Sequence, residues 1–599
     1  MAILRLKKLT FCGLIDDKAA VLQALQALGG LHLIDLNTAP SVPDTFTSDN
    51  AQQVIEALKY LLQCPNRRHQ SKALEHFDID RIANETLDVQ ARIREFSDRH
   101  DALVKRIKEI EPWGNFSLPE AGQLAGYKLW FYIIPRRMLS RLHGNGLIWQ
   151  IVYRDNLYYY VVVVSKQEPP ESAMPVARTH TGSLPLSVLK SQCDQIELAL
   201  EDLQAKRESL TRWISLMALH LAKARDAADL TRAETMTRDE IGVFAVQAWV
   251  PEKAIERFEQ FALQNNLALL AEDPAPDDRP PTLLENNRYL AGGEDVVGFY
   301  QMPGYYGWDP SLVVFFSFAL FFAMILSDAG YAATFAVLLA LRWRRLGQSI
   351  KGQRLRMLAA ITLGVAMLWG MMTGSYFGYS PPEAGVLGAI KFIDMKNYDN
   401  MMRLSVAVGV LHIAMANIRV AYHRRYSTQA LASLGWAWLV IGGFCLWLAR
   451  NLAAPLLEQT AHAMLVLGGL CLLLFSSNRA INGATDWLWR ILAGLKSLIG
   501  ITKLFGDVLS YMRLFALGLA STSLAITFNH LAEQVYTAIP GHGLLLSILI
   551  LLIGHVLNLA LSLLSGVVHG LRLNFIEFYN WGVSDEGYPF KAFSKKGVD

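Results

Sequence analysis

The sequence predicts a mostly α-helical protein in two parts: an N-terminal α/β domain with an antiparallel coiled coil, and a polytopic membrane domain of about eight transmembrane helices. Apolar residues make up 52% of the 599 positions and charged residues only 18%, which is slightly more apolar than an average soluble domain. Charged residues are frequent before about residue 300, whereas long apolar runs alternate with short basic segments after it. We therefore assign the soluble part to residues 1–300 and the membrane part to residues 301–599.

The soluble part is expected to contain two α/β lobes joined by a coiled coil. Residues 3–36 alternate a β-like run, an amphipathic helix and a second β-like run, which predicts a small βαβ lobe. Helical tracts at about 50–111 and 185–238 flank a compact, strand-rich segment, an arrangement typical of an antiparallel coiled coil. The segment after the second tract, residues 242–264, reads as a strand followed by a helix.

The membrane part divides into eight apolar runs. The first two are short for membrane spans of about 20 residues, so we expect them to form a tight hairpin around the sequence SDAGY. The runs are 311–326, 329–341, 357–375, 404–421, 430–449, 460–476, 503–529 and 543–578.

The charges of the connecting loops predict the orientation of these spans. Loop 342–356, the RVAYHRRY segment near residue 424 and the 479–503 connection are basic, whereas the intervening loops hold few positive charges. The positive-inside rule makes the basic loops cytoplasmic and, with an even number of spans, both termini as well. The first residues contain too short an apolar stretch for a signal peptide. We expect a multi-pass protein of the inner (plasma) membrane.

Several classes of function are disfavoured. The net charge of +3 arises from basic residues beside apolar runs and not from a basic face, so we expect no nucleic-acid partner. The five cysteines have no metal-like spacing and predict reduced, buried thiols. Phosphate-binding, metalloprotease and serine-hydrolase motifs are missing from the sequence. We expect no catalytic residue, no bound metal and no cofactor in this chain.

One apolar run contains a permanent charge. Residues 506–528, GDVLSYMRLFALGLASTSLAITF, read as a membrane helix except for Arg513. An arginine at the centre of a span costs roughly 3 kcal/mol on insertion scales, so such a residue is seldom retained without a function. Asp507, Ser510 and Ser521 lie near the same helical face as Arg513.

The last apolar run carries a polar stripe. The steps between its polar residues are three or four, so they share one helical face roughly 25 Å long. Glu577 lies just beyond the stripe, near the cytoplasmic end. Such a face must turn away from lipid. The stripe consists of His555, Asn558, Ser562, Ser565, His569 and Arg572.

Structural roles also fit some of these residues. Serines in membrane helices often only bond to the backbone or join helices, and Arg572 is close enough to its helix end to extend toward the cytoplasm. Arg513 is expected about 15 Å along its helix, where its side chain can reach the cytoplasm less easily. Two arginines together with the stripe favour an ion route.

These residues resemble a known family. SYMRLFALGLAS (510–521), HVLNLALSLLSGVVHGLRLNFIEFY (555–579) and GYPFKAF resemble the last membrane helices of the a subunit, or subunit I, of V-type and A-type rotary ATPases of bacterial and archaeal type. PPTLLENN (280–287), SDAGY (327–331) and WGMMTGSYFGY (369–379) are similar to earlier segments of that family, in the same order. The family usually has glycine where Ser327 and Ala332 stand.

The resemblance implies a non-catalytic stator that couples H⁺ or Na⁺ movement to ATP hydrolysis or synthesis. Its implied partners are a rotating proteolipid c ring, peripheral stalk subunits of the E/G type, a central-stalk or ring-adapter subunit, the ATPase head indirectly, and membrane lipid. Arg513 and Arg572 fall on the family's two functional arginines and would be fixed counter-charges to a carboxylate on the ring. By depth alone, one half-channel takes Asp507, Ser510, His569 and Glu577 toward the cytoplasm, and the other takes His555 and Asn558 toward the outside.

Two alternatives remain on the sequence alone. A secondary ion or anion transporter with a cytoplasmic regulatory domain could use Arg513 to bind an anionic substrate, although the apolar pattern has no evident repeated halves. A membrane-anchored scaffold could use its coiled coil to recruit partners, with the arginines merely structural.

Overall fold

The structure is a computed structural model whose described residues form two compact units. The first unit comprises residues 1–21, 29–36 and 236–593, and the second comprises residues 22–28, 37–235 and 594–599. The functional division at residue 300 stays a prediction. The described residues are 3–37, 49–71, 77–117, 124–142, 147–170, 173–174, 176–182, 184–382, 390–393, 397–477, 479, 483–539, 543–583 and 585–596.

The first unit contains a sheet with strand order β2-β7-β1-β8, and β6 pairs with β7. β1 and β2 both run antiparallel to β7, so β1, α1 and β2 form a split βαβ unit interleaved with a second one, β7-α6-β8. The lobe predicted for residues 3–36 is therefore not a separate sheet, because the short β2 pairs with β7. The elements are β1 (Leu6–Leu14), α1 (Lys18–Leu28), β2 (His32–Ile34), β6 (Arg238–Glu240), β7 (Val243–Pro251), α6 (Ile255–Gln264) and β8 (Ala268–Glu272).

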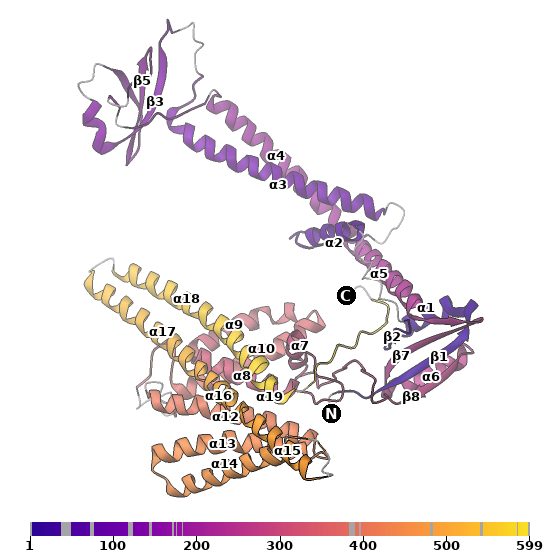
Figure 1. The fold of residues 1–599 in the computed structure, drawn as a ribbon. Helices are drawn as coiled ribbons and strands as arrows, with labels where there is room; N and C mark the ends of the chain where they lie inside the picture. Colours follow the sequence, from indigo (N-terminus) through magenta and orange to yellow (C-terminus); the bar gives the residue numbers. More distant parts are fainter. Residues whose placement is uncertain are drawn as a thin grey trace. The chain divides into compact units, whose positions relative to one another are not determined.

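The second unit contains the helix pair and a small antiparallel sheet of order β3-β5-β4. The chain runs along α3 into this sheet and returns along α4, which packs beside α3 (Figure 1). Asp78 caps α3 through bonds from the backbone N–H groups of Asp80 and Arg81. The elements are α2 (Asp49–Leu62), α3 (Ile79–Ile110), β3 (Lys128–Pro135), β4 (Ile148–Arg154), β5 (Tyr158–Ser165), α4 (Leu186–Leu210) and α5 (Ile214–Met236).

Between residues 292 and 582 most of the described residues are helical. Among the described residues, six helical stretches are long and apolar enough to cross a membrane: Ile350–Thr373, Tyr398–His423, Gln429–Leu452, Pro455–Phe475, Thr485–Ala538 and Gly543–Gly582. The helices are α7 (Gly292–Tyr300), α8 (Ser311–Leu326), α9 (Ala329–Leu346), α10 (Ile350–Thr373), α12 (Tyr398–His423), α13 (Gln429–Leu452), α14 (Pro455–Phe475), α15 (Ala484–Leu498), α16 (Gly500–Ser510), α17 (Met512–Ala538), α18 (Gly543–Arg572) and α19 (Tyr579–Gly582).

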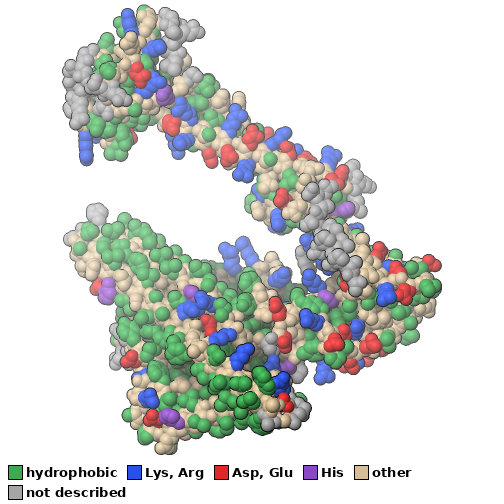
Figure 2. All heavy atoms as spheres, in the orientation of Figure 1, with side chains coloured by type: hydrophobic (Ala, Val, Ile, Leu, Met, Phe, Trp, Pro, Cys, Tyr) green, Lys and Arg blue, Asp and Glu red, His purple; other side chains and the backbone are tan. Residues whose placement is uncertain are grey.

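The helix pair of the second unit and the helices α17 and α18 differ in surface composition. In Figure 2, hydrophobic side chains cover much of the visible face of α17 and α18, whereas charged side chains of both signs line the helix pair of the second unit. Exposed leucine, isoleucine and valine side chains recur along α18. A large exposed apolar surface of this kind is expected where a helix faces lipid or another membrane protein.

The first two apolar helices do not form the expected tight hairpin. α8 and α9 each pack along α10 and barely touch each other. The turn between them is made by Ser327, which is in the left-handed region with φ of 47°, and by Asp328, which caps α9. Because Ser327 is left-handed and Asp328 extended, α9 leaves the line of α8 without folding back on it.

The C-terminal segment returns to the start of the membrane part. Thr282 pairs with Pro589, and the Tyr588 hydroxyl donates a 2.8 Å hydrogen bond to the Arg279 carbonyl oxygen. Further along, Phe593 pairs with Leu31. PPTLLENN and GYPFKAF, which are about 300 residues apart in sequence, are therefore neighbours in the fold.

Candidate functional site

The helix that carries Arg513 is interrupted two residues before it. α16 ends at Ser510 and α17 begins at Met512, and a tighter turn joins them, in which Tyr511 N–H bonds to the Val508 carbonyl oxygen at 3.2 Å. The run predicted for residues 503–529 is therefore helical, but a tighter turn at Tyr511 interrupts it. Arg513 lies in the first turn of α17, and its side chain is half-buried.

A second irregularity follows Arg572. α18 ends there and continues as a π-helical turn, Leu573–Phe578, before α19. This wider turn places Glu577 in the interior, where only 2% of its surface is exposed. π-Helical turns are rare in proteins, and many of those that occur lie at functional sites. Arg572 itself is exposed, so the polar stripe does not turn wholly away from the surface.

The buried line of α18 differs from the predicted stripe. Gly554, Asn558, Ser562, Gly566 and Gly570 are buried at steps of four. The other stripe residues, His555, Ser565 and His569, are half-buried at its margin. The glycines allow close packing, since a Cβ at Gly554 would lie 2.3 Å from the Phe528 ring and one at Gly566 2.7 Å from the Phe322 ring.

Charged groups from α17, α18 and the π turn form one electrostatic cluster. Arg513 and Arg572 lie near enough to His569 and Glu577 for their charges to interact. Among the described residues, the buried atoms Arg513 Nη1, His569 Nδ1 and Glu577 Oε2 have no hydrogen-bond partner. Buried polar atoms are usually paired, so this cluster has unused capacity to bind water, an ion or a group from another protein.

The cytoplasmic group of predicted residues lies around this cluster. Ser510 lies near Glu577, and its hydroxyl donates to the Gly506 carbonyl oxygen at 3.1 Å. Asp507 Oδ2 accepts a 2.7 Å bond from Trp581 Nε1. Ser510 and His569 therefore lie near the buried Glu577 or the arginines, whereas the printed hydrogen bond of Asp507 is to Trp581; the assignment of these residues to a half-channel stays a prediction.

A buried histidine that the sequence reasoning missed supports this region. His412 on α12 has its Nδ1 2.8 Å from the Tyr511 hydroxyl, and its ring stacks on Phe578 with centroids 4.4 Å apart. Both His412 and Tyr511 are buried. One histidine in an apolar helix carries no recognisable sequence signal, because its partners come from distant helices.

The second group of predicted polar residues, His555 and Asn558, lies nearer the N-terminal end of α18. His555 Nδ1 lies 2.8 Å from the Tyr331 hydroxyl, and His555 Nε2 lies 3.1 Å from Asn529 Oδ1. Asn558 Nδ2 donates to the Tyr331 hydroxyl at 3.0 Å and to the Ser521 carbonyl oxygen at 2.9 Å. This network joins α9, α17 and α18.

Two serines extend that network toward the arginines. The Ser521 and Ser562 hydroxyl oxygens are 2.8 Å apart, and Ser562 donates to Asn558 Oδ1 at 3.4 Å. All three side chains are buried. Polar side chains of membrane helices commonly hydrogen-bond to a neighbouring helix in this way. These contacts also make a continuous polar line between α17 and α18.

A buried carboxylate fixes the position of Tyr331. Asp328 is 2% exposed and accepts hydrogen bonds from the backbone N–H groups of Tyr331, Phe377 and Gly378 and from the Ser375 hydroxyl, at 3.1, 2.9, 3.0 and 2.7 Å. SDAGY and WGMMTGSYFGY thus meet at one carboxylate.

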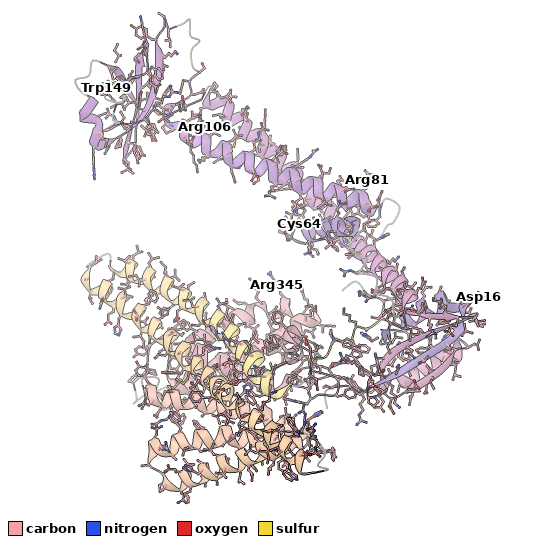
Figure 3. All side chains as sticks on the ribbon, viewed as in Figure 1. Asp16, Cys64, Arg81, Arg106, Trp149 and Arg345 are labelled. Atoms are coloured by element: carbon pink, nitrogen blue, oxygen red, sulfur yellow. The ribbon has the colours of Figure 1, made fainter. Side chains whose placement is uncertain are left out.

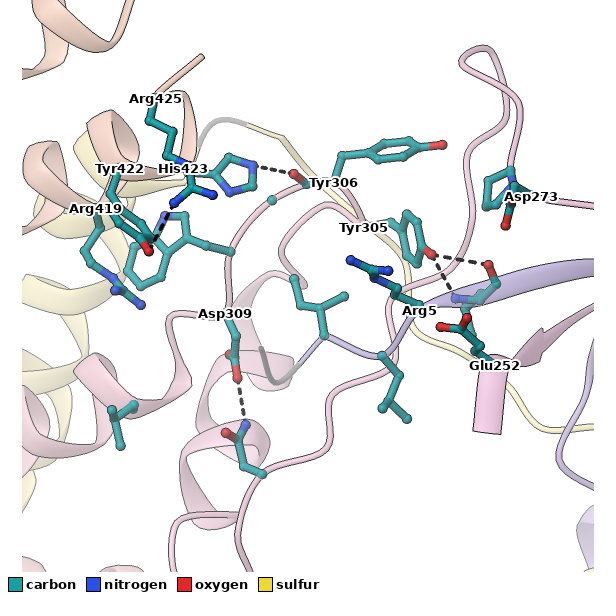
Figure 4. Close-up of a pocket in the computed structure, with 18 of the residues that line it drawn as sticks. Arg5, Glu252, Asp273, Tyr305, Tyr306, Asp309, Arg419, Tyr422, His423 and Arg425 are labelled. Atoms are coloured by element: carbon teal, nitrogen blue, oxygen red, sulfur yellow. Dashed lines mark hydrogen bonds between the residues drawn. The ribbon is translucent and has the colours of Figure 1, made fainter. Parts of the chain in front are cut away.

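A separate pocket of about 720 Å³ in the first unit contains none of the predicted site residues. Its lining includes Arg5, Tyr305, Asp309 and Arg425 (Figure 4), and the Tyr305 hydroxyl accepts a 2.8 Å bond from Leu6 N–H. Basic and acidic side chains both line it. It is not part of the polar line between α17 and α18.

The comparisons with known proteins give a consistent result. No family model matches the chain. A V-type ATP synthase subunit I from Chlamydia muridarum is 25% identical over 96% of this chain and 96% of its own length. One from Borreliella burgdorferi is 24% identical over 99% of both chains. Over nearly its whole length the chain is similar to subunit I of V-type ATP synthases.

Archaeal members and a solved structure add to the comparison. An A-type ATP synthase subunit I from Pyrococcus abyssi is 27% identical over 69% of this chain and 64% of its own length. A crystal structure of the cytoplasmic N-terminal domain of subunit I, a homologue of V-ATPase subunit a, covers 44% of this chain and 99% of that one, with 15% identity and a TM-score of 0.22. A score this low is not evidence of a shared overall shape.

Proposed function

We propose that this chain is a subunit I of the V- and A-type ATP synthases and acts as the non-catalytic membrane stator of a rotary ATPase. In this role it carries H⁺ or Na⁺ between two half-channels while a ring of carboxylate-bearing subunits turns past it. The observation that supports this most is the pair of arginines on α17 and α18, one half-buried and one exposed, beside the buried Glu577.

The physical argument concerns a fixed positive charge. A guanidinium stays charged at any relevant pH, so Arg513 and Arg572 can attract each ring carboxylate as it arrives. An opposite charge within about 4 to 6 Å lowers a carboxylate pKa by one to three units, which favours release of its proton or cation. At an effective dielectric of about 20 the contact is worth roughly 4 kcal/mol. The same charges oppose a direct leak of cations between the half-channels.

The polar groups at the two ends of α18 are candidate half-channels. Asp507, Ser510, His569 and Glu577 would serve the cytoplasmic side, and His555 and Asn558 the outer side. Their separation along the helix supports this, because the step from His555 to His569 is 14 residues, or about 21 Å at 1.5 Å per residue. The serine pair at Ser521 and Ser562 lies between the two groups.

We further propose that the second unit is a cytoplasmic arm held by peripheral stalk subunits. A helix pair with charged sides and a small sheet at one end offers a long surface for such partners. Both termini would then be cytoplasmic. Contacts with the ring, the central stalk and the ATPase head would follow from this assignment.

Purification in mild detergent tests the proposal. If the chain is a stator, it should co-purify with ATPase head subunits and a proteolipid ring, and the membranes should show ATP-driven ion uptake. A chain that purifies alone and binds a small anionic solute would instead support the secondary-transporter alternative and overturn the proposal.

A further inference from the structure

A histidine, a cysteine and a glutamate meet in the helix pair of the second unit. His100 Nε2 on α3 is 3.0 Å from Glu197 Oε1 on α4, and Cys193 Sγ, one turn before Glu197, is 3.8 Å from the same oxygen. One ligand atom from each of the three residues lies within 4.8 Å of the other two. Nitrogen, thiolate and carboxylate donors are the ligands that Zn²⁺ takes in proteins.

His100 and Cys193 occupy positions on the seam between the two helices. Buried residues of α4 recur at Leu186, Leu189, Cys193 and Ile196, with steps of three and four. Residues of α3 that pack in the same region, Leu103, Ile107 and Ile110, continue the same spacing from His100. A polar residue on such a seam costs stability and is typical of a position with a specific role.

The polar trio separates two apolar clusters of the helix pair. Ile110, Leu186 and Leu189 form one cluster. Leu210, Val89 and Ile82 belong to the other, with Ile93 and Leu203 packed against it. Between them His100 and Cys193 occupy two seam positions, with the buried Ile196 beside them. The apolar seam is therefore partly replaced by polar groups where the three donors meet.

Neighbouring acidic groups complete the environment of a cation site. Asp101 Oδ1 lies 3.5 Å from His100 Nδ1, the ring nitrogen opposite the one that faces Glu197. A carboxylate on the far nitrogen is the usual support of a metal-bound histidine. Asp194 and Glu197 both act electrostatically on Cys193. The carboxylates of Asp101 and Glu197 therefore flank the imidazole, and their charge favours a cation.

The distances suit a tetrahedral metal after a small adjustment. With metal–ligand bonds of about 2.0 to 2.3 Å at tetrahedral angles, donor atoms are roughly 3.3 to 3.6 Å apart. The 3.0 and 3.8 Å separations found here bracket that range. Cys193 is only 7% exposed, while Glu197 is largely open to solvent, so an ion could enter from the Glu197 side and water could be its fourth ligand.

We propose that His100, Cys193 and Glu197 form a Zn²⁺ site that cross-links α3 and α4. Asp101 acts as the supporting carboxylate for His100. Loading requires the Cys193 thiol to lose its proton to solvent, and the ion then replaces the His100–Glu197 hydrogen bond. The cross-link holds the register of the helix pair where its apolar seam is interrupted.

Cobalt titration of the purified full-length chain tests this site. Co²⁺ bound by a thiolate in tetrahedral geometry gives thiolate-to-metal charge transfer and visible d–d bands. We expect one such Co²⁺ per chain, displaced by one equivalent of Zn²⁺. Cys193→Ser should abolish the charge-transfer band, and Asp101→Asn should weaken Zn²⁺ binding about 10- to 100-fold.

Matched variants separate metal binding from folding. Cys64→Ser changes another buried cysteine, which lies beside α2 at the opposite end of the helix pair from Arg106 (Figure 3), and should leave the spectrum unchanged. Glu197→Gln changes an exposed side chain, so helix content should be preserved while affinity falls at least tenfold. The proposal is wrong if the wild-type chain gives no thiolate band, or if Cys193→Ser keeps it.

Discussion

The buried carboxylate of Asp328 offers the strongest prediction about stability. Asp328→Ala removes the acceptor of four hydrogen bonds, from three backbone N–H groups and the Ser375 hydroxyl. A buried donor left without a partner costs about 1 to 3 kcal/mol. At the lower limit, four donors cost about 4 kcal/mol. Asp328→Asn keeps one acceptor oxygen and places an amide donor against other donors, so we expect about half that loss.

Thermal unfolding of the purified chain in detergent measures this effect. Asp399→Ala is a suitable control, because Asp399 is an exposed carboxylate at the start of α12. We expect the order of midpoints to be wild type and Asp399→Ala highest, Asp328→Asn lower and Asp328→Ala lowest. Ion uptake should fall in the same order, since Asp328 positions Tyr331 against His555. Equal midpoints for Asp328→Ala and the control would refute the reasoning.

Three further predictions concern packing and turns. Gly518→Leu should lower the thermal midpoint, with a cost of about 1 to 3 kcal/mol, because a Cβ at this position would lie 2.6 Å from a carbonyl oxygen of α8. Gly364→Ala should have no such effect, because the space around Gly364 is open. Tyr511→Phe should destabilise the chain by about 1 to 3 kcal/mol, because it leaves His412 Nδ1 unpaired, and a double-mutant cycle with His412→Phe should reveal coupling between the two residues. Ser327→Gly should be tolerated and Ser327→Val should be destabilising in the same assay, because φ at this position is 47°; equal stability of the two variants would contradict the left-handed turn.

Patterns of local sequence predicted much of the membrane part. Apolar runs indicated helices where α8, α9, α10, α12, α13, α14, α17 and α18 occur, because the length of an apolar run decides whether it can span a membrane. In the part of the chain that the structure describes, six helical stretches meet that length and composition, fewer than the eight expected. The same reasoning selected Arg513 and Arg572, since a permanent charge in an apolar run is conspicuous. The resemblance, not the spacing, connected them to a rotor.

Contacts between distant segments were beyond local sequence patterns. The π turn that buries Glu577 has no recognisable sequence signature. His412 contacts Tyr511, 99 residues later in the sequence. Asp328 accepts a hydrogen bond from a backbone N–H that lies 50 residues later. The pairing of β1 with β7 joins segments more than 200 residues apart. His100 and Cys193 are likewise distant in sequence, so the cysteine spacing alone gave no metal motif.

Ion uptake by vesicles that contain the assembled ATPase tests the central claim most directly. At roughly 4 kcal/mol for the arginine–carboxylate contact, its removal should slow each transfer by about a thousandfold. We predict that Arg513→Gln abolishes ATP-driven uptake and that Arg513→Lys retains little, because lysine can lose its charge when buried. Arg450→Gln, at an exposed arginine near the end of α13, should behave as wild type. Near-normal uptake by Arg513→Gln would contradict the account.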